Sequence, residues 1–306
     1  MTATPIRFDD RVVIVTGAGA GLGRCYALAF AERGARVVVN DLGSDPHGAG
    51  SGTGAADRVV AEIAARGGIA VASHDSVTRG ERIVDTALAA FGRVDVVVNN
   101  AGILRDRTLR KMSDEDWDLV QQVHLGGAFR VTRAAWPHML ERGFGRIVNT
   151  ASPAGLYGNF GQANYAAAKA GLVGFTRALA IEAARSDITV NVIAPIAGTR
   201  LLETVSDAAF VAALKPEYVA PLVLRLCAAH NRENGSVFEV AGGWMAKLRW
   251  ERSRGVAFDV GDGIDPEAVD AAWERIGSFD DTEHPADVRE AAAPVLANLG
   301  LSSRRR

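Results

Sequence analysis

Three side chains near the middle of the sequence have the types and spacing needed to move a proton to or from an alcohol. Tyr165 and Lys169 are four residues apart in an alanine-rich segment, so a helix would place them on one face, one turn apart. An ammonium group beside a phenol favours the phenolate, and we therefore expect the pKa of Tyr165 to be lowered. Such a tyrosine can exchange a proton with an alcohol near neutral pH. Ser152, on the preceding loop, could hold the alcohol or carbonyl oxygen.

A glycine-rich segment near the N-terminus predicts a binding site for a cofactor that could act together with these three side chains. Gly17, Gly21 and Gly23 follow a β-branched run and open a helical pattern near Leu22. Glycines let the backbone approach a pyrophosphate closely, and a helix N-terminus supplies N–H donors and partial positive charge. The spacing is G-x-x-x-G-x-G rather than the commoner G-x-G-x-x-G. Strand, glycine turn and helix in this order predict a dinucleotide site.

Asp41 indicates which dinucleotide binds. It ends the second β-branched run, about twenty residues past the glycines, where a carboxylate can accept hydrogen bonds from the ribose hydroxyls of NAD. The same carboxylate would repel the 2′-phosphate of NADP, and no arginine directly follows it, so we expect NAD. Residues after the third and fourth runs could border the adenine and the nicotinamide ribose: Asp75, Ser76, Asn100, Ala101 and Gly102.

The elements that must position these residues alternate along the chain, which predicts an α/β fold. Near-continuous hydrophobic strands separated by helices are typical of a doubly wound parallel sheet covered on both faces, as in Rossmann-like folds. The expected strands are Val12–Thr16, Arg36–Asn40, Ile69–His74, Val94–Asn99, Arg146–Thr150, Thr189–Ala194 and Ser236–Val240. The expected helices are Leu22–Arg33, Ala55–Arg66, Gly80–Phe91, Asp114–Glu141, Asn164–Arg185 and Pro216–Ala229. We expect an NAD-binding domain over 1–245 and a C-terminal helical extension over 246–306.

Composition excludes several other classes of protein. The formal charge is −2, with 34 basic and 36 acidic side chains, which argues against nucleic-acid binding through a broad basic surface. No apolar run reaches the ~20 residues of a membrane span, and the start of the chain lacks a signal-peptide pattern. Cys25 and Cys227 are too isolated for a disulfide framework, and the histidines show no metal-ligand spacing, so we expect no metal. The sequence ends in Ser-Ser-Arg-Arg-Arg rather than S-K-L, and a cytoplasmic enzyme is the expectation.

The sequence resembles the short-chain dehydrogenase/reductase family over residues from about 8 to 245. The motifs that carry this resemblance are the glycine pattern, Asn99–Gly102, Ser152, the Tyr165/Lys169 pair and Pro195. The resemblance implies a seven-stranded doubly wound sheet. It also implies Tyr165 as acid/base, Lys169 on the nicotinamide ribose and Ser152 orienting the substrate oxygen. The cofactor contacts that it implies include Leu22 on the first helix and the loop residues Pro195, Ala197 and Thr199.

A closer resemblance is to the (3R)-hydroxyacyl-CoA dehydrogenase branch of this family, the dehydrogenase part of type 2 multifunctional enzymes of peroxisomes. The segments that carry it are Val38–Gly43, Asn100–Arg107, Tyr157–Tyr165, Leu214–Val223 and Trp244–Arg252. Two positions depart from the usual family pattern. His124 stands where most members have an asparagine that belongs to a proton relay, and it could hold a relay water or be a core histidine. Ile196 stands where close relatives tend to have asparagine.

This resemblance implies oxidation of a (3R)-3-hydroxyacyl-CoA to the 3-oxoacyl-CoA by hydride transfer to NAD, in fatty-acid or steroid side-chain β-oxidation. It also implies a homodimer in which the extension helps to close the active site or the dimer interface. Basic residues that could bind the CoA phosphates are Arg105, Arg107, Arg110, Lys111, Lys247, Arg249 and Arg252. The alternatives are a 17β-hydroxysteroid dehydrogenase, a 3-oxoacyl reductase, and a non-catalytic NAD-binding scaffold.

Overall fold

The structure is a computed structural model that describes residues 5–197, 213–261 and 263–301. The chain divides into two compact units, Met1–Lys247 and Leu248–Arg306. Each unit is described by itself. In the described part of the chain, no helix combines the length and the apolar character that a membrane crossing requires.

The β-branched runs of the first unit form one sheet. Its strands are β1 Val12–Thr16, β2 Arg36–Asn40, β3 Ile69–Ser73, β4 Val96–Asn99, β5 Gly145–Thr150, β6 Ile188–Ile196, β7 Val237–Ala241 and β8 Trp244–Leu248. Their order is β3-β2-β1-β4-β5-β6-β7-β8, and every pairing from β3 through to β7 is parallel. The carboxyl ends of these strands therefore share one edge of the sheet, where a ligand can meet residues from several strands.

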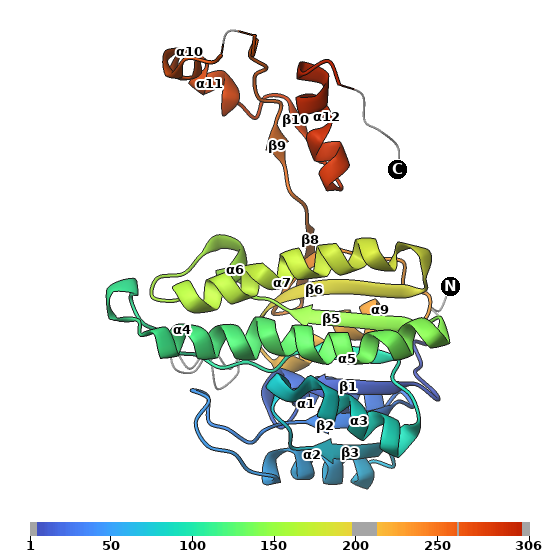
Figure 1. Ribbon diagram of the computed structural model, residues 1–306. Coiled ribbons are helices and arrows are strands. Elements are labelled where there is room, and N and C mark those ends of the chain that lie inside the picture. Colours follow the sequence, from blue (N-terminus) through green and yellow to red (C-terminus); the bar gives the residue numbers. More distant parts are fainter. Residues whose placement is uncertain (1–4, 198–212, 262, 302–306) are drawn as a thin grey trace. The chain divides into compact units, whose positions relative to one another are not determined.

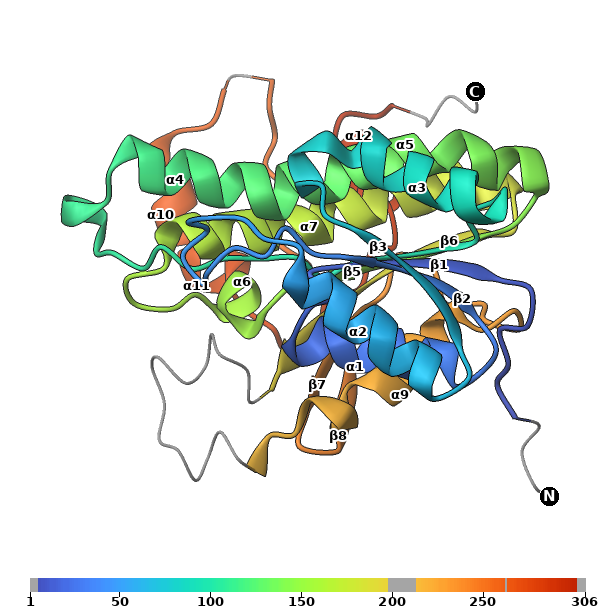
Figure 2. The same cartoon turned by 90° about the horizontal axis from the view of Figure 1, so that it is seen from below.

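Helices cover both faces of this sheet. The helices and helical turns of the first unit are α1 Gly21–Ala31, α2 Gly54–Ala65, η1 Val77–Arg79, α3 Gly80–Phe91, η2 Leu109–Lys111, α4 Asp114–Gln121, η3 Gln122–Gly126, α5 Gly127–Arg142, α6 Pro153–Tyr157, α7 Ala163–Glu182, η4 Ala183–Arg185, η5 Pro216–Tyr218 and α9 Ala220–Cys227. One face carries α3, α4, α5 and α7, and the other carries α1, α2 and α9 (Figures 1 and 2). The predicted doubly wound α/β fold is confirmed, with one strand, β8, more than expected.

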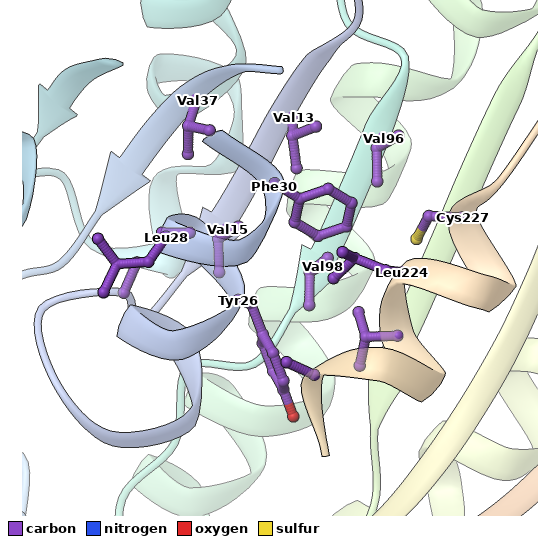
Figure 3. Packing of buried hydrophobic residues seen from close by; sticks show 14 of the residues in the cluster. Val13, Val15, Tyr26, Leu28, Phe30, Val37, Val96, Val98, Leu224 and Cys227 are labelled. Carbon is purple, nitrogen blue, oxygen red and sulfur yellow. The ribbon is translucent and has the colours of Figure 1, made fainter. Parts of the chain in front are cut away.

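The core is split by the sheet into two layers, as the alternation of strand side chains requires. Val13 and Val15 of β1 face the α1 side, where they pack with Phe30 (Figure 3). Val12 and Ile14 of the same strand belong to the cluster on the α3 and α5 side. Because both faces of β1 are buried, its sequence is continuously hydrophobic.

Several details of the first unit differ from the sequence expectation. The single helix expected over Pro216–Ala229 is the turn η5 followed by α9, which ends at Cys227. The single helix expected over Asp114–Glu141 is α4, a π-helical turn (η3) and α5 in succession. The short helix α6, which follows Ser152 directly, was not predicted. Helix α4 begins with a side-chain N-cap, because the Ser113 hydroxyl oxygen accepts a hydrogen bond from the Asp116 backbone N–H.

The second unit is small and contains helices and one short antiparallel pair of strands. Its elements are β9 Arg252–Ser253, α10 Pro266–Ala271, α11 Trp273–Ile276, β10 Thr282–Glu283 and α12 Val288–Asn298. Strands β9 and β10 pair antiparallel. The Asp287 carboxylate caps α12 by accepting from the N–H groups of Arg289 and Glu290.

Both cysteines are buried in the first unit and unpaired. Cys25 lies on α1, and burial together with the nearby Glu217 carboxylate raises its thiol pKa to about 11. Cys227 ends α9 against the sheet (Figure 3), and burial raises its thiol pKa further.

Candidate active site

A cavity of about 800 Å³ opens at the carboxyl edge of the sheet. It is lined by predicted site residues from eight separate segments: Gly17, Gly21, Leu22, Asp41, Asp75, Ser76, Asn100, Ala101, Gly102, His124, Ser152, Tyr165, Lys169, Pro195 and Ala197. Gly23 is packed beneath the glycine turn instead of lining the cavity. Thr199 lies outside the described residues. The volume is in the range of cofactor and ligand sites.

The glycine turn leaves the start of α1 open to the cavity. Helix α1 begins at Gly21, and its N-cap residue Ala20 makes no side-chain capping bond, so no side chain of its own occupies the first N–H groups. Gly17 has a φ of +63°, and a Cβ there would lie 2.7 Å from the Ala101 Cα. A Cβ on Gly23 would lie 2.2 Å from the Gly17 carbonyl oxygen. Only glycine allows this turn to pack so tightly.

Asp41 is held at the end of β2 by two backbone donors. Its Oδ2 accepts from the Gly19 N–H at 2.8 Å, and its Oδ1 accepts from the Gly43 N–H at 2.7 Å. Each carboxylate oxygen keeps acceptor capacity beyond these bonds. The carboxylate is thus oriented beside the glycine turn, where it could accept from ribose hydroxyls.

The ends of β1 and β4 are joined beneath the cavity. The Asn100 Nδ2 donates to the carbonyl oxygens of Thr16 at 2.9 Å and Gly17 at 3.2 Å. The Thr16 hydroxyl oxygen in turn accepts from the backbone N–H groups of Asn100 and Ala101. These bonds fix the glycine turn against the segment after β4. The open helix start, the oriented carboxylate and the fixed turn together fit a dinucleotide.

Ser152, Tyr165 and Lys169 meet at the other end of the same cavity. Ser152 caps α6, since its hydroxyl oxygen accepts from the Ala154 N–H at 3.2 Å, and its hydroxyl also hydrogen-bonds to Tyr165. Tyr165 and Lys169 lie one turn apart on α7, as predicted. The Lys169 ammonium is buried, donates to the Thr150 carbonyl oxygen at 2.5 Å, and lies 5.5 Å from the centre of the Tyr165 ring.

The expected direction of the Tyr165 pKa is wrong for this protein without ligands. Burial raises the pKa of Tyr165 to about 12, the Ser152 hydrogen bond opposes that rise, and the Asp106 carboxylate adds to it. The same burial lowers the pKa of Lys169 to about 7. Desolvation wins because it favours the neutral form of both groups, and the ammonium contacts the Thr150 carbonyl rather than the phenol oxygen.

His124 lies behind this group on the π-helical turn η3. Its ring packs edge to face against the Tyr165 ring, with 5.1 Å between the ring centroids. Its Nε2 is 3.1 Å from the backbone nitrogen and 2.8 Å from the backbone oxygen of Ile103. Burial, together with the Lys169 charge, holds the pKa of His124 well below its usual value, so the ring is neutral. Its Nδ1 is buried without a partner.

The sequence that forms this site is similar to sequences of known proteins. The family model for short chain dehydrogenases matches residues 11–208. The chain belongs to this short-chain dehydrogenase family.

Three similar proteins place the chain within the family. The peroxisomal multifunctional enzyme type 2 of Mus musculus is 57% identical over 298 residues, which are 97% of this chain and 40% of that protein. A short-chain type dehydrogenase/reductase of Mycobacterium tuberculosis is 49% identical, covering 88% of this chain and 94% of that protein. The full-length peroxisomal multifunctional enzyme type 2 of Drosophila melanogaster superposes with a TM-score of 0.83 at 43% identity, covering 96% of this chain and 50% of that one. The chain thus spans half or less of these two multifunctional relatives.

Several cavity residues of this short-chain dehydrogenase were not singled out from the sequence. Asn159 and Gln162 line the cavity just before α7, and Gln122 lines it from η3. The spacing of Gln162, three residues before Tyr165, could have indicated a shared helix face. Nothing in the local sequence marks η3, because a π-helical turn has no distinctive composition.

The basic residues considered for CoA binding do not line this cavity where the structure describes them. Arg105 donates to the Asp116 carboxylate and to the His47 carbonyl oxygen. Lys247 pairs with Glu233 at 2.6 Å, and Arg252 pairs with Glu283. These three cations already have partners within the chain.

Proposed function

We propose that the chain oxidises (3R)-3-hydroxyacyl-CoA thioesters to 3-oxoacyl-CoA with NAD. The observation that carries the proposal is one cavity with an open helix N-terminus and Asp41 at one end and Ser152, Tyr165 and Lys169 at the other. The choice of thioester rests on the sequence resemblance to (3R)-hydroxyacyl-CoA dehydrogenases and on the multifunctional relatives. The choice of NAD over NADP rests on the carboxylate of Asp41.

The residues of the chain have separate tasks in this reaction. A bound NAD supplies the acceptor for the hydride that leaves the substrate carbon. Ser152 holds the hydroxyl oxygen, and Tyr165, as phenolate, takes the hydroxyl proton. Lys169, beneath Tyr165 on α7, is the cation that would hold the cofactor ribose and favour the phenolate.

The other residues assigned to the cofactor would hold its remaining parts. The start of α1 and the glycine turn would hold the pyrophosphate, and Asp41 would hold the adenosine ribose. Those expected at the adenine, the nicotinamide and its ribose are Asp75, Ser76, Asn100, Ala101, Gly102, Pro195, Ala197 and Thr199.

His124 would support proton transfer by holding a water molecule. A second cavity of about 10 Å³ lies behind Lys169 and is lined by His124, Asn99 and Thr150. His124 Nδ1, Asn99 Oδ1 and Thr150 Oγ1 are all buried without a partner. A polar cavity of this size has room for about one water, which could bond to these atoms. We favour the relay role for His124 over that of a core histidine on this ground.

The assembly and the compartment are part of the same proposal. We propose a homodimer in which the C-terminal unit helps to close an active site or the dimer interface. We propose a cytoplasmic location: the unpaired cysteines fit a reducing compartment, and the C-terminal residues are not an S-K-L signal. The mouse and Drosophila relatives are named as peroxisomal. Sedimentation and cell fractionation test these two points.

The experiment that tests the function follows reduced-nicotinamide absorbance with matched (3R)- and (3S)-hydroxyacyl-CoA, with NAD or NADP. A 17β-hydroxysteroid is assayed alongside. We expect turnover of the (3R) thioester with NAD. Activity with the steroid alone would establish the hydroxysteroid alternative, and NAD binding without any turnover would favour the scaffold.

Replacing the proton acceptor provides the matched variant. Tyr165→Phe should lower kcat/KM by roughly 10²- to 10⁴-fold, because the proton acceptor is removed, while NAD binding is kept. Tyr218→Phe, on the exposed turn η5, is the control and should behave as the wild type. Wild-type turnover by Tyr165→Phe would contradict the assignment.

A further inference from the structure

Gln162 occupies a position in the cavity that the proposed reaction has not yet used. It precedes the first residue of α7, so its side chain lies near that of Tyr165, three residues later. The side chain lines the large cavity and is only 7% exposed. A buried amide at this place must satisfy its hydrogen bonds either within the chain or with a ligand.

Both ends of the Gln162 amide are held by neighbours. Its Nε2 donates to the Asp106 Oδ2 at 2.7 Å, and its Oε1 accepts from the Asn159 Nδ2 at 2.9 Å. The backbone fixes the same pair, because the Arg107 N–H donates to the Gly161 carbonyl oxygen at 2.8 Å. An ionised carboxylate only accepts, so Asp106 permits one orientation of the amide, with the nitrogen toward itself.

This orientation leaves one donor unused. The amide nitrogen of glutamine carries two hydrogens, and Asp106 takes one of them. The (3R)-3-hydroxyacyl thioester of the proposed function has a second oxygen, the thioester carbonyl, two carbons from the reacting one. We propose that the remaining Nε2–H of Gln162 donates to this carbonyl oxygen while Ser152 and Tyr165 hold the C3 oxygen. Asp106 is then a positioning residue that acts through Gln162.

The consequence is selection for alcohols with a carbonyl group β to the hydroxyl-bearing carbon. A substrate without that carbonyl would leave a buried donor unpaired, which lowers kcat/KM by about tenfold to a hundredfold. Sites built to hydrogen-bond one substrate group reject analogues that lack it more strongly than apolar pockets do. The inference rests on the proposed function and specifies which part of the substrate is recognised.

The test uses two probes that differ in one group, with the full chain and NAD. One is (3R)-3-hydroxybutyryl-CoA, and the other is its thioether analogue, in which a methylene replaces the thioester carbonyl. The ratio of the two kcat/KM values measures recognition of the carbonyl. Asp106 also raises the pKa of Tyr165, and this acts on both probes alike, so the ratio does not register it.

Four variants separate the donor from its support. We expect Gln162→Met and Asp106→Leu to bring the ratio from tenfold or more down to near one. Asp106→Asn keeps an acceptor oxygen for Gln162 and should retain most of the preference. Gln122→Met tests the other cavity-lining glutamine and should leave the ratio at its wild-type value.

The outcomes distinguish this inference from the proposed function. Equal losses on both probes in Gln162→Met would mean a structural role and overturn the inference, as would a ratio that changes only in Gln122→Met. In both cases the wild type still oxidises the thioester, so the proposed function stands. Oxidation of neither probe by the wild type would overturn the proposed function and the inference with it.

Discussion

Burial decides the charge of the residues at the reacting end of the cavity. Tyr165, Lys169 and His124 are neighbours in a region with little water, and all three are shifted toward their neutral forms. A neutral tyrosine cannot accept a proton, so the site without ligands lacks the base that the reaction needs. A positive charge on Lys169 would lower the pKa of the Tyr165 phenol, and the phenolate that results could act as the base.

The lowered pKa of Lys169 predicts how the stability of the protein varies with pH. Between about pH 7, its pKa in the folded protein, and 10.5, the unfolded chain binds a proton that the folded chain does not. Stability therefore rises with pH in this window, by up to about 1.4 kcal/mol per unit. Relative to Lys169→Met, the wild type should gain roughly 2 kcal/mol in free energy of unfolding between pH 7 and pH 9.

Urea unfolding at the two pH values measures this difference. Lys215→Met replaces an exposed lysine and serves as the control. The raised pKa of Tyr165 lowers stability only above pH 10, beyond the range compared. Parallel curves for the wild type and Lys169→Met would show that the folded protein keeps this lysine charged.

At the scale of elements, the start of α1 depends on the absence of a side chain at Gly23. A methyl group at Gly23 would meet the Gly17 carbonyl oxygen at 2.2 Å, and a backbone atom cannot rotate away as a side chain would. We expect Gly23→Ala to lower the free energy of unfolding by about 1–3 kcal/mol and to weaken dinucleotide binding, because the turn must shift.

Gly174→Ala is the matched control for this substitution. Gly174 lies inside α7 with nothing within 4 Å of an added Cβ, so alanine should stabilise that helix by about 1 kcal/mol. Denaturation and NAD titration of both variants provide the comparison. Full NAD affinity in Gly23→Ala would mean that the turn can relax without loss of the site.

The strands and most helices were predictable because their signals are local. The runs that form β1 and β2 were expected with the bounds that they have, since a strand buried on both faces is continuously β-branched. The π-helical turn η3 and the short helix α6 were not expected. Both depend on neighbours in space, and α6 has only five residues, too few for a periodic pattern.

The site was predictable as a set of residues but not as a set of charges. The ends of β1, β2, β4 and β5 bring Gly17, Asp41, Asn100 and Ser152 to one cavity, as the parallel arrangement requires. The pKa of Tyr165 could not be derived from spacing, because it depends on desolvation by distant segments. The Asp106–Gln162 bond likewise joins residues 56 positions apart.

At the scale of the whole molecule, the cavity and the core belong to the first unit alone. Every described residue that lines the large cavity lies between Gly17 and Ala197, and the clusters that form the core end at Val240. A chain ending at Arg249, which keeps β8 whole, should unfold cooperatively and bind NAD. We expect it to lose turnover of the acyl-CoA if the C-terminal unit helps to close an active site.

Calorimetry of the shortened chain, with and without NAD, checks the first half of this prediction. The absorbance assay checks the second half. Failure of the shortened chain to fold would show that the C-terminal unit is needed for stability. Full acyl-CoA turnover would limit that unit to roles outside catalysis.

The reactivity of the two buried thiols reports how often the folded chain opens. Only the thiolate reacts readily with disulfide reagents or peroxide, and the pKa of about 11 at Cys25 leaves about one molecule in 10³ as thiolate at pH 8. With Cys227 shielded further, an aromatic disulfide reagent should release colour from the native chain only slowly, while two equivalents appear at once in urea. The slow labelling that remains would time spontaneous unfolding, and comparison with Cys25→Ala would show whether α1 and α9 open together or one after the other. Rapid colour from the native chain would place at least one sulfur within reach of solvent.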